Sequence, residues 1–224
     1  MVEAYKKESN PMMRRPVVLP ELVAFMRERQ AQLTGELAQL QAFARAQNIP
    51  VIPHETVVYF QFLLGLLRPK KILEVGTAIG FSTLLLADSC PNAEITTLER
   101  YEEMLIFARK NLSARKNIHL IEGEAAETLE QLTEPFDFIF MDSAKTQYVK
   151  FLPRLLALLS ADGVLIIDDV FQAGDILQAL TEIPRRERNI IKGLNALFDA
   201  VFDNPHLQAT LVPLGDGLLM IRKK

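Results

Sequence analysis

Hydrophobic positions follow two different spacings along most of this 224-residue chain. Short, mainly apolar runs such as Lys71–Val75 and Phe136–Met141 predict strands that are buried on both faces, as in a parallel sheet. The segments between such runs carry apolar residues every three or four positions and predict helices. This alternation predicts an α/β fold with a doubly wound, mostly parallel sheet.

The expected elements form a regular series. The expected strands are Lys71–Val75, Glu94–Leu98, Ile118–Ile121, Phe136–Met141 and Gly163–Ile167. The expected helices are His54–Leu67, Phe81–Ser89, Tyr101–Arg115, a short one from Glu124, Thr146–Leu159 and Asn189–Phe202. A terminal hairpin of Leu207–Val212 and Leu218–Arg222 should bring one antiparallel strand into the sheet.

The N-terminal part of the chain precedes this series. Between Pro20 and Asn48 there is no proline, and the apolar residues there predict one long amphipathic helix, bent near Gly35. The only plausible boundary lies near Pro50–Pro53. We therefore expect one domain over residues 1–224, in which a helical segment of residues 1–53 acts as a lid or oligomer contact for an α/β core of residues 54–224.

Composition narrows the class of protein. The single cysteine, Cys90, excludes a disulfide framework and a multi-cysteine metal site. No apolar stretch reaches the roughly 20 residues of a membrane helix, and residues 1–16 lack the apolar core of a signal peptide, so we expect a cytoplasmic enzyme without membrane contact. The net charge of -3 argues against a generally basic surface for nucleic acid.

Two runs of arginine qualify that conclusion. They fit either local positive patches for RNA or solvated helix ends. The residues are Arg14, Arg15, Arg185, Arg186 and Arg188.

The segment Ile72–Thr83 reads ILEVGTAIGFST and is the most informative in the chain. Gly76 and Gly80 frame a tight turn between a strand and a helix, and glycine permits positive φ and close approach to a ligand. The helix that follows directs free N–H groups toward this turn. Because the spacing is not the G-x-G-x-x-G of dinucleotide sites, a cofactor without a pyrophosphate is favoured.

Acidic residues follow the later strands. Glu99 ends the second strand, where a doubly wound fold places a carboxylate for ribose hydroxyls, although it could instead cap the next helix. Asp142, Asp168 and Asp169 should meet at the carboxyl edge of the sheet. Converging carboxylates repel one another unless a cation lies between them, and oxygen ligands suit Mg²⁺. For an isolated pair of aspartates, helix capping would be the preferred interpretation.

The order of these segments resembles a known family. ILEVGTAIGFST, ITTLER, IEGEA, FDFIFMDSAKTQY and GVLIIDDV resemble the metal- and S-adenosylmethionine-dependent O-methyltransferases of the catechol and caffeoyl-CoA type. The resemblance runs from about Leu19 to the end and implies a Rossmann-like class I methyltransferase fold. The segments RRERN and TLVPLGDGLLMIRKK are most similar to the bacterial branch that methylates 5-hydroxyuridine in tRNA.

The resemblance implies roles for particular residues. It implies cofactor contacts for Ile52, Glu74, Gly76, Thr77, Gly80, Ser82, Glu99, Gly123, Glu124, Ala125 and Asp142. It implies a divalent cation on Asp142, Asp168 and Asp169, and proton removal from the attacking hydroxyl by Lys145. Without it, Ile52 is a core residue and Lys145 a surface lysine. The family usually has Asp-Asn at positions 168 and 169, which puts the role of Asp169 in doubt.

The sequence alone does not decide which molecule accepts the methyl group or which oligomer forms. An anticodon stem-loop of tRNA would place its phosphates on the arginine runs, whereas a catechol or hydroxycinnamoyl thioester would suit the acidic overall charge. A noncatalytic or dehydrogenase-type nucleotide-binding domain is the third hypothesis. The family habit, with apolar residues such as Phe198 and Phe202, favours a homodimer.

Overall fold

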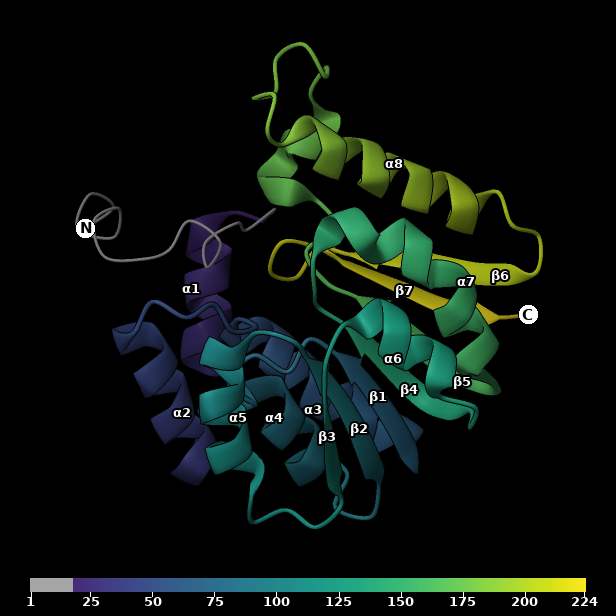
Figure 1. Ribbon diagram of the computed structural model, residues 1–224. Coiled ribbons are helices and arrows are strands. Elements are labelled where there is room, and N and C mark those ends of the chain that lie inside the picture. Colours follow the sequence, from purple (N-terminus) through teal and green to yellow (C-terminus); the bar gives the residue numbers. More distant parts are fainter. Residues whose placement is uncertain (1–17) are drawn as a thin grey trace.

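A seven-stranded sheet forms the centre of the protein (Figure 1). The structure is a computed structural model and describes residues 18–224. Its strands are β1 (Lys71–Val75), β2 (Glu94–Glu99), β3 (Ile118–Glu122), β4 (Phe136–Met141), β5 (Leu159–Ile167), β6 (Leu207–Val212) and β7 (Leu218–Lys223). Their order across the sheet is β3-β2-β1-β4-β5-β7-β6, in which β1 to β5 are parallel and β7 is antiparallel to both neighbours. The expected doubly wound sheet with one antiparallel strand is confirmed.

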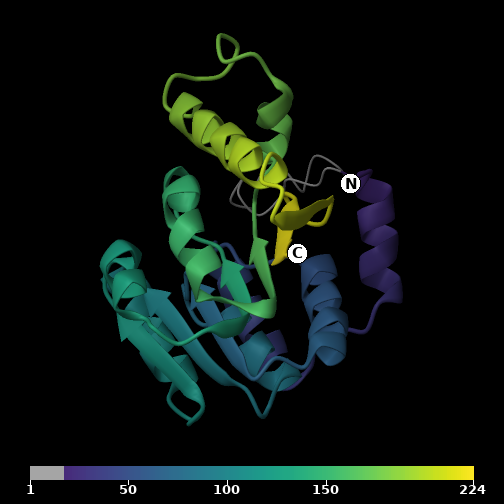
Figure 2. The same cartoon turned by 90° about the vertical axis from the view of Figure 1, so that its right-hand side faces the viewer.

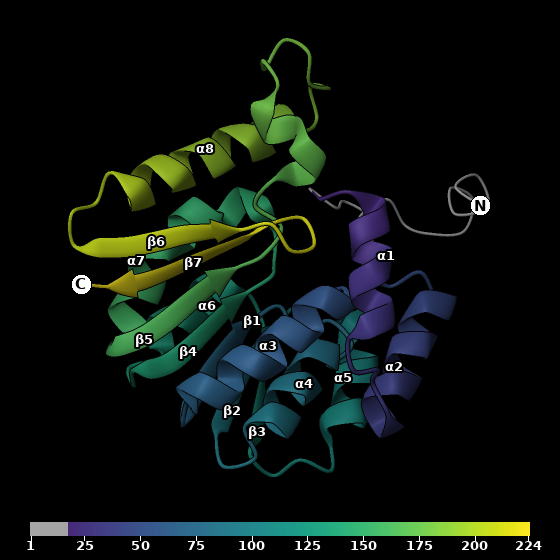
Figure 3. The ribbon, with the colours of Figure 1, turned by 180° about the vertical axis from the view of Figure 1, so that it is seen from behind.

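Helices cover both faces of this sheet. They are α1 (Pro20–Arg29), α2 (Gly35–Ala46), α3 (His54–Leu67), α4 (Phe81–Ser89), α5 (Glu102–Leu112), α6 (Ala125–Gln131), α7 (Tyr148–Leu158) and α8 (Arg188–Phe202). Figure 3 shows α3, α4 and α5 on one face, and Figure 1 shows α6 and α7 on the other, with α8 beside the hairpin of β6 and β7.

The core is therefore divided into two layers by the sheet. Successive side chains of a strand point to opposite faces, so Ile72 and Phe138 pack in the layer of α3 and α4, whereas Leu73 and Ile139 pack in the layer of α6 and α7. Because both faces of β1 and β4 are buried, their sequences are almost continuously apolar, which is why they were predictable.

The prediction of one long N-terminal helix is wrong. Helix α1 ends at Arg29, because Gln30 is extended at φ -78° and ψ 155°. Thr34 is also extended, and Gly35 has φ +61°, so α2 starts as a separate helix. Thr34 is the N-cap residue of α2, and threonine is a favoured residue at that place in a helix. The new helix start interrupts an apolar periodicity that runs through both helices.

Other boundaries shift by a few residues. The helix expected from Thr146 begins as a 3₁₀ turn, η3 (Lys145–Gln147), before α7. Strand β5 starts at Leu159 rather than Gly163. A second 3₁₀ segment, η4 (Gln172–Leu177), follows β5 and was not expected.

Some large apolar side chains lie on the surface. Leu22 and Phe25 on α1 are about half exposed, and Phe62 on α3 is more so. Phe202 is exposed on α8 as expected, whereas Phe198 is partly buried against the core. No helix within residues 18–224 combines the length and the apolar character that crossing a membrane requires.

Gly76 lies where the ends of β1 and β4 approach most closely. It has φ +110°, and a Cβ there would lie 1.8 Å from the carbonyl oxygen of Asp142. Any side chain at residue 76 would therefore push apart the two strands that carry the edge of the sheet.

We expect Gly76→Ala to lower the free energy of unfolding by at least about 3 kcal/mol, since positive φ and steric overlap both oppose a methyl group. Gly65→Ala is the matched control, because a Cβ at this α3 position meets nothing within 4 Å. The control should raise stability by about 0.5–1 kcal/mol. Urea unfolding of the two variants checks this, and equal stabilities would contradict it.

Candidate active site

A cavity of about 1340 Å³ opens at the carboxyl edge of the sheet. The ends of β1, β2, β3, β4 and β5 line it, together with α1, residues 47–53 and the turn between β6 and β7. Its volume exceeds the roughly 300–1,000 Å³ of a site for one small ligand, so it has room for a cofactor and part of an acceptor.

Most of the cofactor residues implied by the sequence line this cavity. They are Ile52, Gly76, Thr77, Ser82, Glu99, Gly123, Glu124, Ala125 and Asp142. Glu74 and Gly80 lie behind this wall, where they support the glycine turn.

The turn after β1 is fixed by its neighbours. The N–H groups of Gly76 and Thr77 both donate to the carbonyl oxygen of Leu98 in β2, at 3.0 and 3.1 Å. Gly80 has φ +88° and is the N-cap of α4. The first turn of α4 therefore presents N–H groups to the cavity side of the glycine turn, as expected.

Glu99 holds the loops on either side of it. Its Oε2 accepts a hydrogen bond from the N–H of Ala78 at 2.8 Å, and its Oε1 accepts from the N–H groups of Arg100 and Tyr101, both at 2.8 Å. Ala78 has φ +46°, so this carboxylate also stabilises a backbone conformation that alanine rarely adopts. Glu99 does not cap α5, because that helix begins at Glu102 and the bonded N–H groups precede it, so the alternative of helix capping is wrong. The ribose contact stays a prediction, which the remaining acceptor capacity of these oxygens permits.

Glu74 forms the centre of a buried hydroxyl network. Thr83 and Thr97 donate hydrogen bonds to its Oε2, and the hydroxyls of Thr77 and Thr97 lie 2.6 Å apart. Burial raises the pKa of Glu74 from its ordinary value of 4.5 to about 7, and hydrogen bonds from Ser82, Thr83 and Thr97 oppose the rise. The network links the glycine turn to β1, β2 and α4.

Arg100 closes the rim of the cavity between β2 and β3. Its guanidinium donates to both carboxylate oxygens of Glu124, at 3.0 and 3.2 Å, and lies 4.5 Å from the ring centroid of Tyr101. The carboxylate of Glu124 therefore forms an ion pair with Arg100, a residue to which the sequence analysis gave no role.

Asp142 and Asp168 are brought together, as expected, at the ends of β4 and β5. Burial raises the pKa of Asp142 to about 7, and the charge of Asp169 adds to the rise. Burial also raises the pKa of Asp168 well above its usual range, with further contributions from Asp169 and Asp142. Asp168 is buried and Asp142 half-buried, and the charge of Asp142 opposes the ionisation of Asp168, so the two provide hard oxygen ligands for a cation.

Asp169 is oriented differently from these two. Its Oδ2 lies 3.0 Å from Nζ of Lys145 in a buried ion pair. Within residues 18–224, no group of three acidic, histidine or cysteine side chains is arranged to hold a metal ion. Asp142 and Asp168 therefore fit a metal by their chemistry, whereas the complete set of three does not fit one in this arrangement.

Lys145 is buried rather than on the surface, with 8% of the residue exposed. Besides Asp169, its Nζ donates to Oε1 of Gln172 at 3.0 Å and lies 3.7 Å from Oδ2 of Asp216. Lys145 does not line the cavity itself, but Asp169 and Asp216 do. It lies directly behind the cavity wall.

The sequence interpretation missed three groups at the site. Asp216 lies in the Leu214–Gly217 turn, where its segment carried the family resemblance but was considered only as a hairpin turn. Gln172 had no recognisable signal. Arg27 of α1 forms a two-point ion pair with the buried Glu55 of α3, at 2.7 and 3.0 Å, and both line the cavity. This pair brings α1 to the cavity wall, and the lid role of the N-terminal segment stays a prediction.

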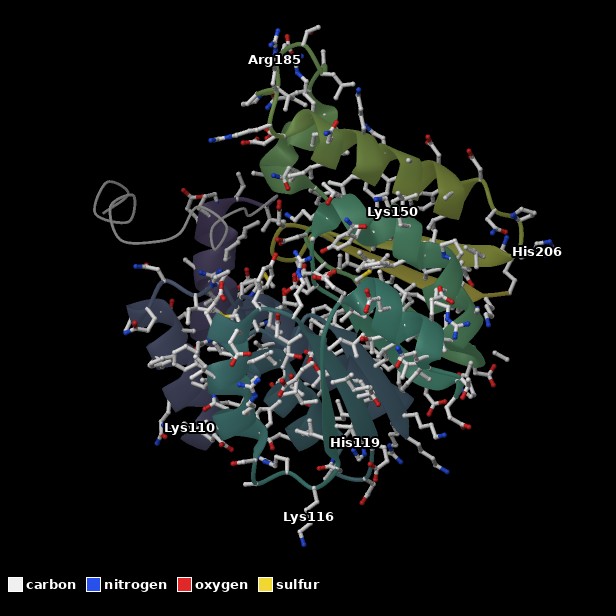
Figure 4. The ribbon with its side chains drawn as sticks, in the orientation of Figure 1. Lys110, Lys116, His119, Lys150, Arg185 and His206 are labelled. Carbon is white, nitrogen blue, oxygen red and sulfur yellow. The ribbon has the colours of Figure 1, made fainter. Side chains whose placement is uncertain are left out.

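The arginine runs are separate from the cavity. Arg185 lies at the tip of the loop before α8, far from Lys110, Lys116 and His119 at the opposite end of the molecule (Figure 4). Arg188 instead braces this loop, because its guanidinium donates to the carbonyl oxygens of Ile183 and Thr181. Arg14 and Arg15 lie outside the described residues.

The walls of the cavity are strongly acidic. Seven acidic residues line it: Glu55, Glu99, Glu124, Asp142, Asp168, Asp169 and Asp216. The two arginines that line it, Arg27 and Arg100, are paired with Glu55 and Glu124. Lys145 behind the wall pairs with Asp169 and Asp216, but acidic residues still outnumber basic ones around the cavity, which makes it more favourable for a positively charged ligand than for phosphate groups.

Comparisons with known proteins identify the family and match the fold. Residues 27–224 match the family model described as O-methyltransferase. A catechol O-methyltransferase of Niastella koreensis is 30% identical, over 72% of this chain and 77% of its own length. A caffeoyl-CoA O-methyltransferase of Stellaria longipes is also 30% identical, over 72% of this chain and 71% of its own. The crystal structure of the methyltransferase PaMTH1 of Podospora anserina, bound to SAH, has a TM-score of 0.83 at 25% identity and covers 92% of this chain and 98% of its own.

The raised pKa of Glu74 predicts a pH dependence of stability in the protein without cofactor. Between pH 4.5 and 7 the folded state keeps the Glu74 proton that the unfolded state releases, so this group's contribution to stability falls as the pH rises through this window. Relative to Glu74→Gln, the parent should therefore lose up to about 3 kcal/mol between pH 4.5 and 8.

Urea unfolding of both proteins at several pH values measures this difference. Most other groups that titrate in the same window are shared by parent and variant, so they cancel. Asp142 is the exception, because the charge of Glu74 raises its pKa in the parent alone. A difference that stays constant with pH would contradict the raised pKa.

Proposed function

This chain belongs to the O-methyltransferase family, and from that premise we propose that it methylates the 5-hydroxyl of 5-hydroxyuridine in tRNA, giving 5-methoxyuridine. As a member of this family it is an S-adenosylmethionine-dependent O-methyltransferase, so the dehydrogenase hypothesis is set aside. The observation that carries the methyl-transfer chemistry is the single acidic cavity, which begins at the glycine turn and ends at Asp142 and Asp168.

The charge of the cavity suits this cofactor. S-adenosylmethionine carries a sulfonium cation but no pyrophosphate, and seven acidic residues line the cavity against two arginines, so its walls favour a positive charge over phosphate groups. Gly76 lines the cavity, and the Cβ that it lacks would lie against the carbonyl oxygen of Asp142, so a glycine here lets the ends of β1 and β4 come together at the cavity wall. Glu99 and the segment Gly123–Ala125 are the proposed walls of the adenosine part.

The proposed acceptor is an RNA base that enters the cavity without its phosphates. Phosphate groups are repelled by the acidic walls, so a nucleotide must turn its base out of the stack and into the cavity. Arg185 and Arg186, both exposed in the loop before α8, provide positive charge outside the cavity for the backbone of an anticodon stem-loop. The resemblance of RRERN and the terminal hairpin to the tRNA-modifying branch supports this assignment.

The alternative acceptor is a small catechol or a hydroxycinnamoyl thioester. Relatives at 30% identity are named for catechol and caffeoyl-CoA, and a compact aromatic diol needs no positive surface outside the cavity. Both kinds of acceptor present two neighbouring oxygens, so the same site chemistry serves either.

We further propose that Asp142 and Asp168 hold a divalent cation, with Mg²⁺ as the expected ion. Such a cation would lower the pKa of an acceptor hydroxyl bound beside it. The support is the position of the two acids at the ends of neighbouring strands, where Asp168 is buried and Asp142 half-buried, while Lys145 forms its ion pairs with Asp169 and Asp216.

The chain's own residues then position the reactants. When bound, S-adenosylmethionine would supply the methyl group, and the cavity would hold the acceptor oxygen so that the C–O bond forms as the C–S bond breaks, with the electron pair of that bond left on sulfur. The hydroxyl proton passes to the Asp169–Lys145 pair at the wall. We also propose a homodimer, to which the exposed apolar side chains of α1 and α3 would contribute.

Removal of the cation should stop methyl transfer, and Mg²⁺ should restore it after treatment with a chelator. Asp142→Asn and Asp168→Asn should each lower the rate at least about 100-fold and weaken Mg²⁺ binding in calorimetry. Neither should lower the melting temperature, because each removes one of two carboxylates that repel each other.

The control is Asp162→Asn, at an exposed position of β5. It should leave both rate and Mg²⁺ affinity unchanged. Full activity in the presence of chelator would contradict the metal proposal but not methyl transfer.

The acceptor is tested by mass spectrometry of tRNA nucleosides from cells with and without this protein. We expect 5-methoxyuridine to disappear and 5-hydroxyuridine to accumulate when the protein is absent. The double variant Arg185→Glu/Arg186→Glu should raise KM for hydroxyuridine-containing tRNA about tenfold while leaving turnover of 3,4-dihydroxybenzoate unchanged. The double variant Lys110→Glu/Lys116→Glu, at the opposite end of the molecule, is the charge-matched control (Figure 4). Unchanged tRNA nucleosides with efficient methylation of the catechol would favour the small-molecule alternative.

A further inference from the structure

The loop after β5 contains a cluster of unusual backbone conformations. Asp169, Gln172 and Ala173 have φ of +59°, +49° and +54°, and Gly174 has φ +88°. Left-handed residues other than glycine cost on the order of 1 kcal/mol or more each, and they persist only where surrounding structure holds them. Such a cluster beside a cavity suggests that the loop has a positional task.

The turn between β6 and β7 holds this loop in place. The N–H of Val170 donates to the carbonyl oxygen of Gly217 at 3.1 Å, and the N–H of Phe171 donates to that of Asp216 at 2.9 Å. The N–H of Ala173 donates to Oδ1 of Asp216 at 2.7 Å. These three bonds pair the loop with the hairpin turn. Figure 2 shows the strands of the hairpin, in yellow, beside the green end of β5.

Packing reinforces these hydrogen bonds. The ring of Phe171 lies against Gly217, where a Cβ would be only 2.2 Å from the ring. Gly217 also has φ +89°, so no other residue fits at this contact without displacing the loop. The hairpin turn thus acts as a rigid template for the loop.

The loop held in this way directs a side-chain oxygen at Lys145. Gln172 is buried, and its Oε1 accepts a hydrogen bond from Nζ of Lys145 at 3.0 Å. The other two oxygens around Nζ belong to Asp169, in the same loop, and Asp216, in the template. A flexible lysine side chain is therefore held from two segments that are far apart in the sequence.

We propose that Gln172 is a positioning residue for Lys145, fixed in its left-handed conformation by the hairpin turn around Asp216. Gln172 supplies a neutral acceptor, which orients the ammonium group without adding a further charge to four nearby carboxylates. It keeps Nζ beside Asp169 at the cavity wall. The importance of this placement of Lys145 for catalysis rests on the proposed function. The placement itself can be tested without any assay of methyl transfer.

The first experiment measures the labelling of Lys145 by acetic anhydride in the protein without cofactor. Peptide mass spectrometry reports its rate relative to the exposed Lys150 in the same sample. In Gln172→Met, which keeps the length of the side chain but loses the acceptor, Lys145 should be labelled at least about fivefold faster. Gln172→Glu keeps an acceptor oxygen and should stay within twofold of the parent.

Matched variants separate positioning from loss of fold. Gln178→Ala removes an exposed glutamine that bonds only Asp175 through its side chain, and it should change nothing. Asp216→Asn keeps an acceptor for the Ala173 N–H and weakens the ion pair, so it should raise labelling of Lys145 even if Gln172→Met does not fold. Unchanged labelling in a folded Gln172→Met, or equal labelling in the Met and Glu variants, would overturn the proposal.

The second experiment is a double-mutant cycle with Lys145→Ala, using whichever of hydroxyuridine-containing tRNA and 3,4-dihydroxybenzoate the parent methylates. Gln172→Met should lower kcat about tenfold with little change in the affinity for S-adenosylmethionine, and it should have no further effect once Lys145 is alanine. Additive losses would contradict a role through Lys145. If the parent methylates neither acceptor, the proposed function is wrong. The labelling experiment then still shows whether Gln172 positions Lys145.

Discussion

Four carboxylates surround one ammonium group at the carboxyl edge of the sheet. Asp142, Asp168 and Asp169 come from the ends of β4 and β5, and Asp216 comes from the hairpin turn. Burial of so many like charges is unfavourable, and the raised pKa values of Asp142 and Asp168 express this cost. The rest of the site compensates for it: Lys145 balances Asp169 and Asp216, and the N–H of Asp169 donates to Asp168 at 2.7 Å.

The same constraint explains why the antiparallel hairpin matters to a site built on parallel strands. Strand β7 pairs with β5, so the turn that precedes β7 lies next to the loop that follows β5. Only this antiparallel placement brings Asp216 within reach of Ala173 and Lys145. The last strands of the chain therefore do more than complete the sheet, because they hold the backbone that carries Asp169 and Gln172.

The sequence predicted those features that depend on local pattern and on sheet geometry. Strands buried on both faces leave continuous apolar runs, so β1 and β4 were placed correctly, and the meeting of Asp142 with Asp168 followed from their positions at strand ends. The break between α1 and α2 was missed because apolar periodicity continues across it. The partners of Lys145 were missed because Gln172 and Asp216 reach it only through tertiary contacts, and a glutamine in a loop has no periodicity to reveal it.

The charge distribution also constrains how an acceptor can be bound. The carboxylates attract the sulfonium of the cofactor and repel phosphate, whereas Arg185 and Arg186 lie outside the cavity on an exposed loop. A nucleic acid that binds both regions must therefore separate its base from its backbone, with the base in the cavity and the phosphates on the loop. A small aromatic acceptor is subject to no such separation. The two kinds of acceptor thus differ in what they require of the protein. A nucleic acid must bind both the acidic cavity and the separate arginine loop, whereas a small aromatic acceptor must fit only the cavity.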